Sequence, residues 1–225
     1  MSHYAVAVFS DDGDFDQLLE KYNECNDKYF VFKPADDVRE SYERFKLNNP
    51  ESDYTFRDFV AAFNYILVDG QYGHMVNPHG YWDWYTLDGK DFLFDLKPEA
   101  TLEEFSSDYR KNDYDWYPDN RCDAKDAEEF WDEYIAKTDV EVPGLYTRNY
   151  YLERYRTKEQ FVKEESRTIP YAFITPDGQW HSAGVVGFFG LSDETAESAN
   201  KYAEEWDAWI QSEANPYVNL VDCHI

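Results

Sequence analysis

The chain of 225 residues carries 47 acidic and 21 basic residues, which gives a formal net charge of -26 and a pI near 4.3. A field of this sign repels nucleic-acid phosphates and anionic membrane surfaces, so it argues against direct binding to either and favours basic partners. Hydrophobic residues make up 43% of the chain and aromatic residues 19%, enough apolar surface to exclude a disordered protein.

The first third of the chain predicts helices around two strands. Residues 3–9 form an apolar run typical of a buried strand, and the acidic stretch 10–24 after it predicts a helix. Residues 28–33 predict a second strand. Residues 36–47 and 55–67 predict helices, because their apolar side chains recur at helical spacing.

The middle of the chain predicts a hairpin followed by a helix. Residues 81–87 and 91–96 read as strands joined by Asp88-Gly89, a dipeptide suited to a tight turn. Residues 124–137 place apolar and aromatic side chains on one stripe, which predicts a helix.

The C-terminal third predicts strands on either side of two helices. Thr157 opens a capping box for a helix over residues 157–167. Residues 170–190 read as a strand, a turn at Pro176-Asp177-Gly178 and a glycine-punctuated strand. Residues 193–211 predict a long helix, and residues 217–225 a closing strand.

These elements do not alternate strictly, which favours an α+β fold with a single, mostly antiparallel sheet flanked by helices. Both terminal strands are apolar enough to be central. We expect one domain over residues 1–225, with a helical acidic insertion over residues 101–168.

Cysteine content and hydropathy bear on the compartment. Cys25, Cys122 and Cys223 are odd in number and irregularly spaced, so they predict reduced thiols, not a disulfide framework. No opening apolar run of signal-peptide length and no run of eighteen apolar residues occurs, so we expect a cytoplasmic protein.

Acid is concentrated in two helical segments. Residues 101–141 hold 14 acidic and 5 basic residues, and residues 193–213 hold 7 and 1. The carboxylates expected to point outward, and to bind a basic partner, are Asp126, Glu128, Glu129, Asp132, Glu133, Glu194, Glu197, Glu204 and Glu205. Carboxylates three or four residues apart on a helix lie about 5 to 6 Å apart, close to the spacing of successive phosphates. The alternative is a solvated face that serves solubility.

The sequence contains no specific catalytic or metal motif. His74 and His79 lack the pattern of a zinc site, and Cys223 and His224 are adjacent, so on a strand their side chains point to opposite faces. We therefore expect no catalytic residue, metal or cofactor, although a hydrolytic domain stays open as an alternative.

Several short motifs resemble an uncharacterised family of bacterial and phage proteins that has no established activity. They are Asn77-Pro78 with Trp82-Asp83-Trp84-Tyr85 and Gly89, Pro170-Tyr171-Ala172-Phe173 with Thr175-Pro176-Asp177-Gly178 and Trp180, Gly187-Phe188-Phe189-Gly190, and Val221-Asp222-Cys223-His224-Ile225. The resemblance covers about forty residues and implies a fold and an association with phage or mobile elements. Where the family has Gly-Gly-Arg-Trp, this chain has Asp88-Gly89-Lys90-Asp91, which favours divergence toward protein binding.

The stretch NPHGYWDWYTLDGKD also suggests a ligand pocket. On a strand, Trp82 and Trp84 share one face, which we expect to enter the core, while Tyr81, Asp83 and Tyr85 share the other. The residues that could line such a pocket are His79, Tyr81, Asp83, Tyr85, His181 and His224. The alternative is aromatic packing across a sheet.

Three functions follow as hypotheses. The first is a non-enzymatic, phage-associated acidic protein that binds a basic host protein, for example a nuclease, by imitating nucleic acid. The second is a small-ligand-binding or hydrolytic domain with its site near the WDWY strand. The third is a housekeeping domain whose acidity reflects a high-salt host.

Overall fold

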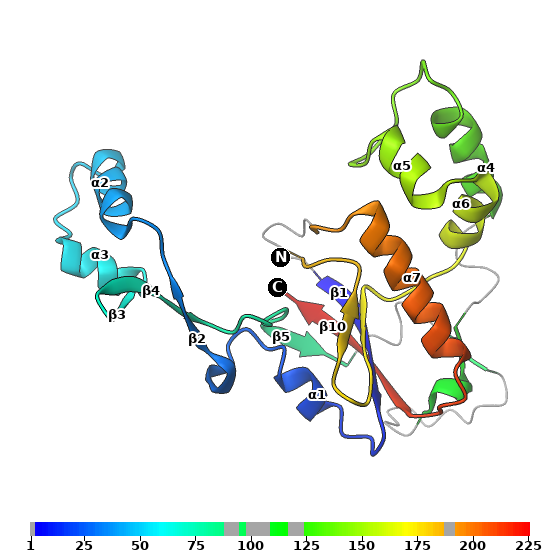
Figure 1. Cartoon of the computed structure of the whole chain (residues 1–225), viewed down its shortest axis with the longest axis horizontal. Helices are drawn as coiled ribbons and strands as arrows, with labels where there is room; N and C mark the ends of the chain where they lie inside the picture. The colour runs from blue at the N-terminus through cyan, green and yellow to red at the C-terminus, as the bar shows by residue number, and fades with distance from the viewer. Residues whose placement is uncertain (1–2, 88–94, 98–108, 117–123, 187–191) are drawn as a thin grey trace. The chain divides into compact units, whose positions relative to one another are not determined.

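The computed structural model describes residues 3–87, 95–97, 109–116, 124–186 and 192–225 (Figure 1). Its contacts divide the chain into two compact units. The first unit is formed by Met1–Leu19 with Tyr81–Ile225, and the second by Glu20–Gly80. We expected one domain with an insertion over residues 101–168, but the inserted unit is Glu20–Gly80.

The first unit is built on a five-stranded sheet of strand order β5-β10-β1-β8-β9. Its strands are β1 (His3–Ser10), β5 (Trp84–Thr86), β8 (Ala172–Ile174), β9 (Trp180–Ser182) and β10 (Tyr217–His224). β1 pairs in parallel with β8, and the other three pairings are antiparallel. The α+β class and a mostly antiparallel sheet are therefore confirmed, and both terminal strands are central.

Strand β1 is almost continuously apolar because both of its faces are covered. Val6 and Val8 point to one face and Ala7 and Phe9 to the other, and all four are fully buried. A strand with one solvated face would alternate apolar and polar residues instead.

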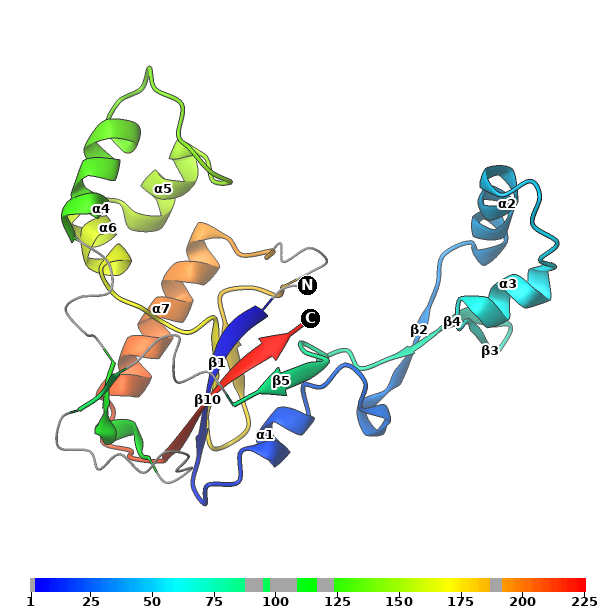
Figure 2. The same cartoon turned by 180° about the vertical axis from the view of Figure 1, so that it is seen from behind.

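Helix α7 (Ala196–Gln211) lies along this sheet in both views (Figures 1 and 2). It begins at Thr195, whose hydroxyl accepts a hydrogen bond of 3.1 Å from the Ser198 amide. The fully buried Trp206 packs with its ring centre 5.4 Å from that of Phe173 and 6.3 Å from that of Phe9. These rings form part of the apolar contact between helix and sheet.

The C-terminal end of α7 is capped by a buried lysine. The ammonium group of Lys111 donates to the carbonyl oxygens of Trp209 (3.0 Å), Ile210 (3.1 Å) and Ser212 (2.7 Å). The last carbonyls of a helix have no intrahelical donor and carry the negative end of its dipole, so a cation is stabilising there. Lys111 opens the short 3-10 helix η3 (Lys111–Asp113).

Three further helices pack together in the first unit. They are α4 (Ala124–Phe130), continued by a π-helical turn η4 (Trp131–Ile135), α5 (Arg148–Tyr155) and α6 (Lys158–Glu165). Their shared core is Ala127, Trp131, Ile135, Tyr155 and Phe161. The expected helix over residues 124–137 is thus present, whereas α5 was not predicted.

The cap predicted at Thr157 is present in part. The Thr157 hydroxyl accepts a hydrogen bond of 3.1 Å from the Gln160 amide. The Gln160 side chain donates to Glu164 Oε1 at 3.1 Å instead of returning to Thr157. The helix therefore begins at the predicted residue without the reciprocal bond of a capping box.

The hairpin predicted through Asp88-Gly89 has its turn outside the described residues. Its first arm contains β5, which pairs with β10, and its second contains β6 (Asp95–Leu96), which pairs with β7 (Tyr114–Asp115). This two-stranded ladder and the sheet of the second unit are additions to the single sheet that we expected.

The second unit has a three-stranded sheet of order β2-β4-β3 beside two helices. Its elements are η1 (Asp27–Tyr29), β2 (Val31–Pro34), α2 (Val38–Asn48), α3 (Phe56–Ala62), β3 (Ile66–Val68) and β4 (Gln71–Val76). Phe59 is buried, with ring centres of Phe45 and Phe63 at 5.4 and 4.6 Å. An aromatic cluster of this kind compensates for the small size of the unit.

The helix predicted over residues 55–67 ends earlier than expected. Asn64 has a φ of 55°, a left-handed conformation that does not continue a helix. Ile66–Val68 then pairs with β4 through a two-residue turn in which Asp69 and Gly70 have φ of 47° and 81°. Positive φ at both residues is typical of the type I′ hairpin turn.

Candidate functional site

A pocket of about 540 Å³ lies in the first unit, between α4, α5, α6 and the beginning of α7. We call it the tyrosine pocket, because six tyrosines line it: Tyr146, Tyr150, Tyr151, Tyr155, Tyr171 and Tyr202. The charged residues of its lining are Asp126, Arg154, Glu165 and Glu194. A concave, mainly aromatic cavity with a few convergent polar groups is typical of a ligand site.

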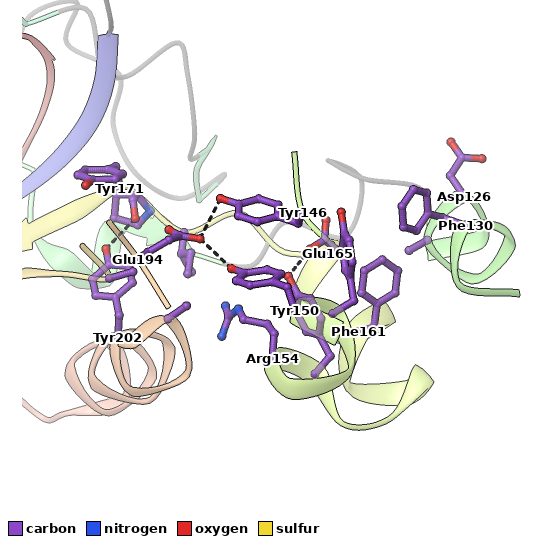
Figure 3. Close-up of a pocket in the computed structure, with 17 residues that line it drawn as sticks. Asp126, Phe130, Tyr146, Tyr150, Arg154, Phe161, Glu165, Tyr171, Glu194 and Tyr202 are labelled. Atoms are coloured by element: carbon purple, nitrogen blue, oxygen red, sulfur yellow. Dashed lines mark hydrogen bonds between the residues drawn. The ribbon is translucent and has the colours of Figure 1, made fainter. Parts of the chain in front are cut away.

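Glu194 connects two elements of the pocket wall. Its Oε1 accepts hydrogen bonds from the hydroxyls of Tyr150 (2.8 Å) and Tyr146 (3.1 Å), as Figure 3 shows. The two rings are stacked, with centres 4.2 Å apart and planes inclined by 13°. The residue preceding the Thr195 cap of α7 therefore fixes two aromatic side chains that come from α5 and the segment before it.

The single arginine of the pocket lining is already paired. Arg154 Nη2 lies 3.1 Å from Glu164 Oε2, and Nη1 donates to Asn200 Oδ1 at 2.7 Å. Glu165 accepts a hydrogen bond of 2.7 Å from the Tyr155 hydroxyl. The lining thus contains three carboxylates and one guanidinium that already has a carboxylate partner, so the pocket is acidic.

The phenols of the pocket stay neutral over the ordinary pH range. Burial raises the pKa of Tyr150 and of Tyr155, and hydrogen-bonded carboxylates raise it further. Burial also raises the pKa of Tyr171 to about 12. The negative charge of the pocket therefore comes from its carboxylates alone.

The acidic residues expected on α4 and η4 point to solvent. Asp126, Glu128, Glu129, Asp132 and Glu133 are all exposed, and Asp126 also reaches the tyrosine pocket. Two lysines approach them: Lys158 Nζ lies 2.8 Å from Asp132 and 4.0 Å from Glu128, and Lys125 Nζ lies 3.5 Å from Glu129.

The acidic residues expected at α7 divide into two groups. Glu197 and Glu204 are exposed. Glu205 is partly buried, with its Oε2 3.0 Å from His181 Nδ1 and its Oε1 3.4 Å from Lys201 Nζ. Glu194 belongs to the tyrosine pocket, so only part of this set forms a free acidic face.

The WDWY strand separates its two indoles. Trp82 is 5% exposed and donates from Nε1 to the Leu19 carbonyl at 3.2 Å, at the end of α1 (Asp16–Glu20). Trp84 is 43% exposed and stacks on the His224 ring at 4.8 Å. The expectation that both indoles enter the core is wrong, because regular pairing with β10 begins only at Trp84.

The six residues of the expected ligand pocket do not gather at one place. Asp83 Oδ1 and His224 Nδ1 do meet, at 2.7 Å, and His224 Nε2 is buried without a hydrogen-bond partner among the described residues. His181 lies on β9 beside Glu205, three strands from β10 in the sheet order.

The remaining residues of the set, His79, Tyr81 and Tyr85, have different surroundings from one another. The Tyr81 ring lies 4.9 Å from the Trp180 ring, and the Tyr85 hydroxyl donates to Asp16. His79 is exposed and belongs to the second unit. None of the six expected residues lines the tyrosine pocket.

The sequence did carry a signal for the tyrosine pocket. Residues 146–155 read YTRNYYLERY, and Tyr146, Tyr150, Tyr151 and Tyr155 recur at spacings that place them on one side of a helix. The chain has 20 tyrosines, so a local cluster of them is a weak signal, and the partners Tyr171, Glu194 and Tyr202 are distant in the sequence.

Three findings concern other site classes. Among the described residues, no three His, Cys, Asp or Glu side chains are close enough to hold a metal ion. Within the same described ranges, no helix has the length and hydropathy needed to span a membrane. Cys25 and Cys223 are free thiols, one exposed and one buried, and Cys122 lies outside the described residues.

The scan of protein-family models, the search of curated proteins and the search of solved structures each gave no match to the chain.

Proposed function

We propose that this protein is a non-enzymatic acidic binding protein whose carboxylates recognise a basic partner protein. The observation that supports it is the exposed acidic face of α4 and η4, formed by Asp126, Glu128, Glu129, Asp132 and Glu133. Among the described residues, only Lys125 and Lys158 form ion pairs with this face. Two lysines therefore offset only part of the charge of five carboxylates, and the face stays net negative.

The charge of the whole chain supports the same proposal. A net charge of -26 accelerates the encounter with a positively charged protein and disfavours negatively charged competitors. Exposed ion pairs are screened by salt, so such a complex forms readily at low ionic strength and weakens as salt rises.

We propose further that the partner is a basic host protein that binds nucleic acid, such as a nuclease, and that the acidic face imitates a row of phosphates. The proposed setting is phage-associated and cytoplasmic. Support comes from the helical carboxylate spacing of about 5 to 6 Å and from the motif resemblance to bacterial and phage proteins.

The test is capture of partners from host lysate on the tagged protein at low and at moderate salt, with identification by mass spectrometry. A nucleic-acid-binding protein that is recovered at low salt and displaced by added DNA supports the proposal. Binding that is equally tight at both salt concentrations overturns it, because the proposed contacts are screened by ions.

A matched pair of variants separates the acidic face from total charge. The first variant neutralises Glu128, Glu129, Asp132 and Glu133 as Gln or Asn. The control neutralises the exposed Glu40, Glu43, Glu51 and Asp53 of the second unit, which changes the net charge equally. Loss of the partner in the first variant alone locates the binding surface, whereas equal loss in both shows that only net charge matters.

We propose small-ligand binding as a second function, with the tyrosine pocket as its site instead of the WDWY strand. The supporting observation is the pocket itself, about 540 Å³ with convergent polar groups. The hydrolytic version has less support, because burial raises the pKa of the Cys223 thiol beside His224 and keeps it protonated.

A further inference from the structure

We propose that the tyrosine pocket binds an organic cation with a methylated ammonium head group. The inference rests on the second proposed function, since it names the class of ligand for that site. Three features of the pocket carry it: its aromatic faces, its uncompensated carboxylates, and the engagement of its tyrosine hydroxyls with protein acceptors.

Aromatic rings make up most of the pocket wall. Besides the six tyrosines, Phe130 and Phe161 line it, and their rings are stacked with centres 5.8 Å apart. The face of an aromatic ring carries negative electrostatic potential and attracts a cation within about 6 Å of its centre. Several such faces around one cavity form the kind of cage that recognises quaternary ammonium groups.

The charge of the pocket selects the same ligand class. Glu194, Glu165 and Asp126 contribute three carboxylates, and the only cation of the lining, Arg154, is paired with Glu164. An anionic ligand would meet these carboxylates without a free guanidinium to offset them. A cationic ligand supplies the missing counter-charge.

The tyrosine hydroxyls favour a methylated head group over a primary ammonium. Tyr146 and Tyr150 donate to Glu194, Tyr155 donates to Glu165, Tyr171 donates to the Gly184 carbonyl (2.7 Å), and Tyr202 donates to the Pro170 carbonyl (2.6 Å). These bonds hold the rings in place before a ligand arrives, which lowers the entropic penalty of binding. A methylated ammonium group has few or no N–H donors and relies on these fixed ring faces, whereas a primary ammonium group also needs hydrogen-bond acceptors.

The first experiment is a calorimetric titration of the full chain with three related probes, two of which have the same size. They are choline, its neutral isostere in which a tert-butyl group replaces the trimethylammonium group, and ethanolamine. Choline is expected to bind at least about tenfold more tightly than the isostere, because only choline gains from the ring faces and the carboxylates. Ethanolamine is expected to bind more weakly than choline, because its ammonium group is more strongly hydrated.

A charge variant assigns the binding to the pocket. Glu194→Gln removes the charge while its amide oxygen still accepts hydrogen bonds from Tyr146 and Tyr150. It should weaken choline binding about tenfold and leave the isostere unaffected. The control is Glu197→Gln, which removes one charge from the exposed first turn of α7 outside the pocket lining and should change neither affinity.

A second pair of variants tests the aromatic wall independently of charge. Tyr146→Leu removes a ring that is 40% exposed, and Tyr54→Leu removes one that is 42% exposed in the second unit. Both proteins should fold, because neither ring is buried. Choline binding should fall several-fold in the first variant only.

A fourth probe distinguishes the two sources of a methylated ammonium group. A short peptide containing trimethyllysine that binds more tightly than choline identifies a protein side chain as the occupant, and the reverse order identifies a free small molecule. Both results support the proposed head group.

Three results overturn the inference in different ways. Equal affinity for choline and its isostere removes the cation proposal but leaves small-ligand binding in place. No heat and no competition from any probe removes small-ligand binding at this pocket as well. Binding that survives both Glu194→Gln and Tyr146→Leu unchanged shows that the probes occupy another site.

Discussion

The Glu194 carboxylate accepts a hydrogen bond of 2.8 Å from the Tyr150 hydroxyl, joining the start of α7 to α5 across 44 residues of sequence. This bond lies in the wall of the tyrosine pocket and has a charged acceptor. Hydrogen bonds to charged groups contribute more to stability than neutral ones. The pair therefore serves both the packing of the helices and the shape of the pocket.

Tyr150→Phe should destabilise the first unit. The variant leaves Glu194 with the weaker bond from Tyr146 and should lower the free energy of unfolding by about 1 to 2 kcal/mol. The control is Tyr151→Phe, at the next position of α5, whose hydroxyl has no hydrogen-bond partner among the described residues. It should change the free energy of unfolding by less than about 0.5 kcal/mol.

Tryptophan fluorescence is a suitable measurement, because all 7 tryptophans lie in the first unit and report on it alone. Urea titrations of the two tyrosine variants should differ in midpoint and agree in slope. Equal midpoints would show that the bond to Glu194 contributes nothing to stability.

Lys111→Met should destabilise the end of α7. The substitution keeps the apolar stem but removes the lysine donor to the Ile210 and Ser212 carbonyls and one of several donors to the Trp209 carbonyl, and we expect a loss of about 2 to 4 kcal/mol. Lys201→Met is the control, because the Lys201 side chain is 76% exposed and pairs only with Glu205 among the described residues. It should cost less than about 1 kcal/mol. Amide hydrogen exchange over residues 205–212 should accelerate in the Lys111 variant, and unchanged exchange there would contradict the capping role.

Stability should decline at alkaline pH. Burial raises the pKa of Tyr171 and of Tyr114 to about 12, from the ordinary value of 10. Because each pKa is higher in the folded protein than in the unfolded chain, the unfolded chain loses its tyrosine protons first as the pH rises. The contribution of these tyrosines to stability is therefore complete below pH 10 and is lost toward pH 12. Each tyrosine contributes a slope of at most about 1.4 kcal/mol per pH unit, and less for the half-buried Tyr171.

Lys111 changes stability with pH in the opposite direction at the lower end of this alkaline range. Burial lowers the pKa of Lys111 from 10.5, so its contribution to stability rises with pH and is complete once the unfolded lysine has also lost its proton. The fall should therefore be steepest between about pH 10.5 and pH 12. Urea unfolding across this range is the measurement, and Tyr171→Phe should make the decline shallower. A flat profile would contradict the assigned burial of these phenols.

The two described thiols should differ sharply in reactivity. Burial raises the pKa of Cys223, and the thiolate is the reactive form, so Cys223 should resist alkylation in the folded protein. Cys25 is exposed and should react under the same conditions. Peptide mass spectrometry after brief iodoacetamide treatment, with and without urea, measures both sites in one sample. Labelling of Cys223 without urea would show that the strand β10 opens readily.

Local patterns in the sequence predicted the main elements of the first unit. β1 and β10 were recognisable because continuous apolar runs need no partner to be identified, and α7 because its apolar stripe follows Thr195. The helix predicted over residues 55–67 is present as α3 but ends at Ala62, because Asn64 and the run Ile66–Val68 form a turn and a strand. The hairpin predicted through Asp88-Gly89 stays a prediction, and the Asp-Gly turn that the structure describes, Asp69-Gly70, was not predicted.

The sequence by itself determined the charge, the aromatic content and the apolar character of the terminal strands, because these depend only on composition and on nearest neighbours. Only the tertiary structure decided that Trp82 is buried while Trp84 is exposed, and that Asp83 meets His224 across 141 residues. It likewise decided that Tyr150 of α5 bonds to Glu194 in the wall of one pocket. Such contacts depend on how distant segments pack, and the local period of a sequence carries no information on which segments meet.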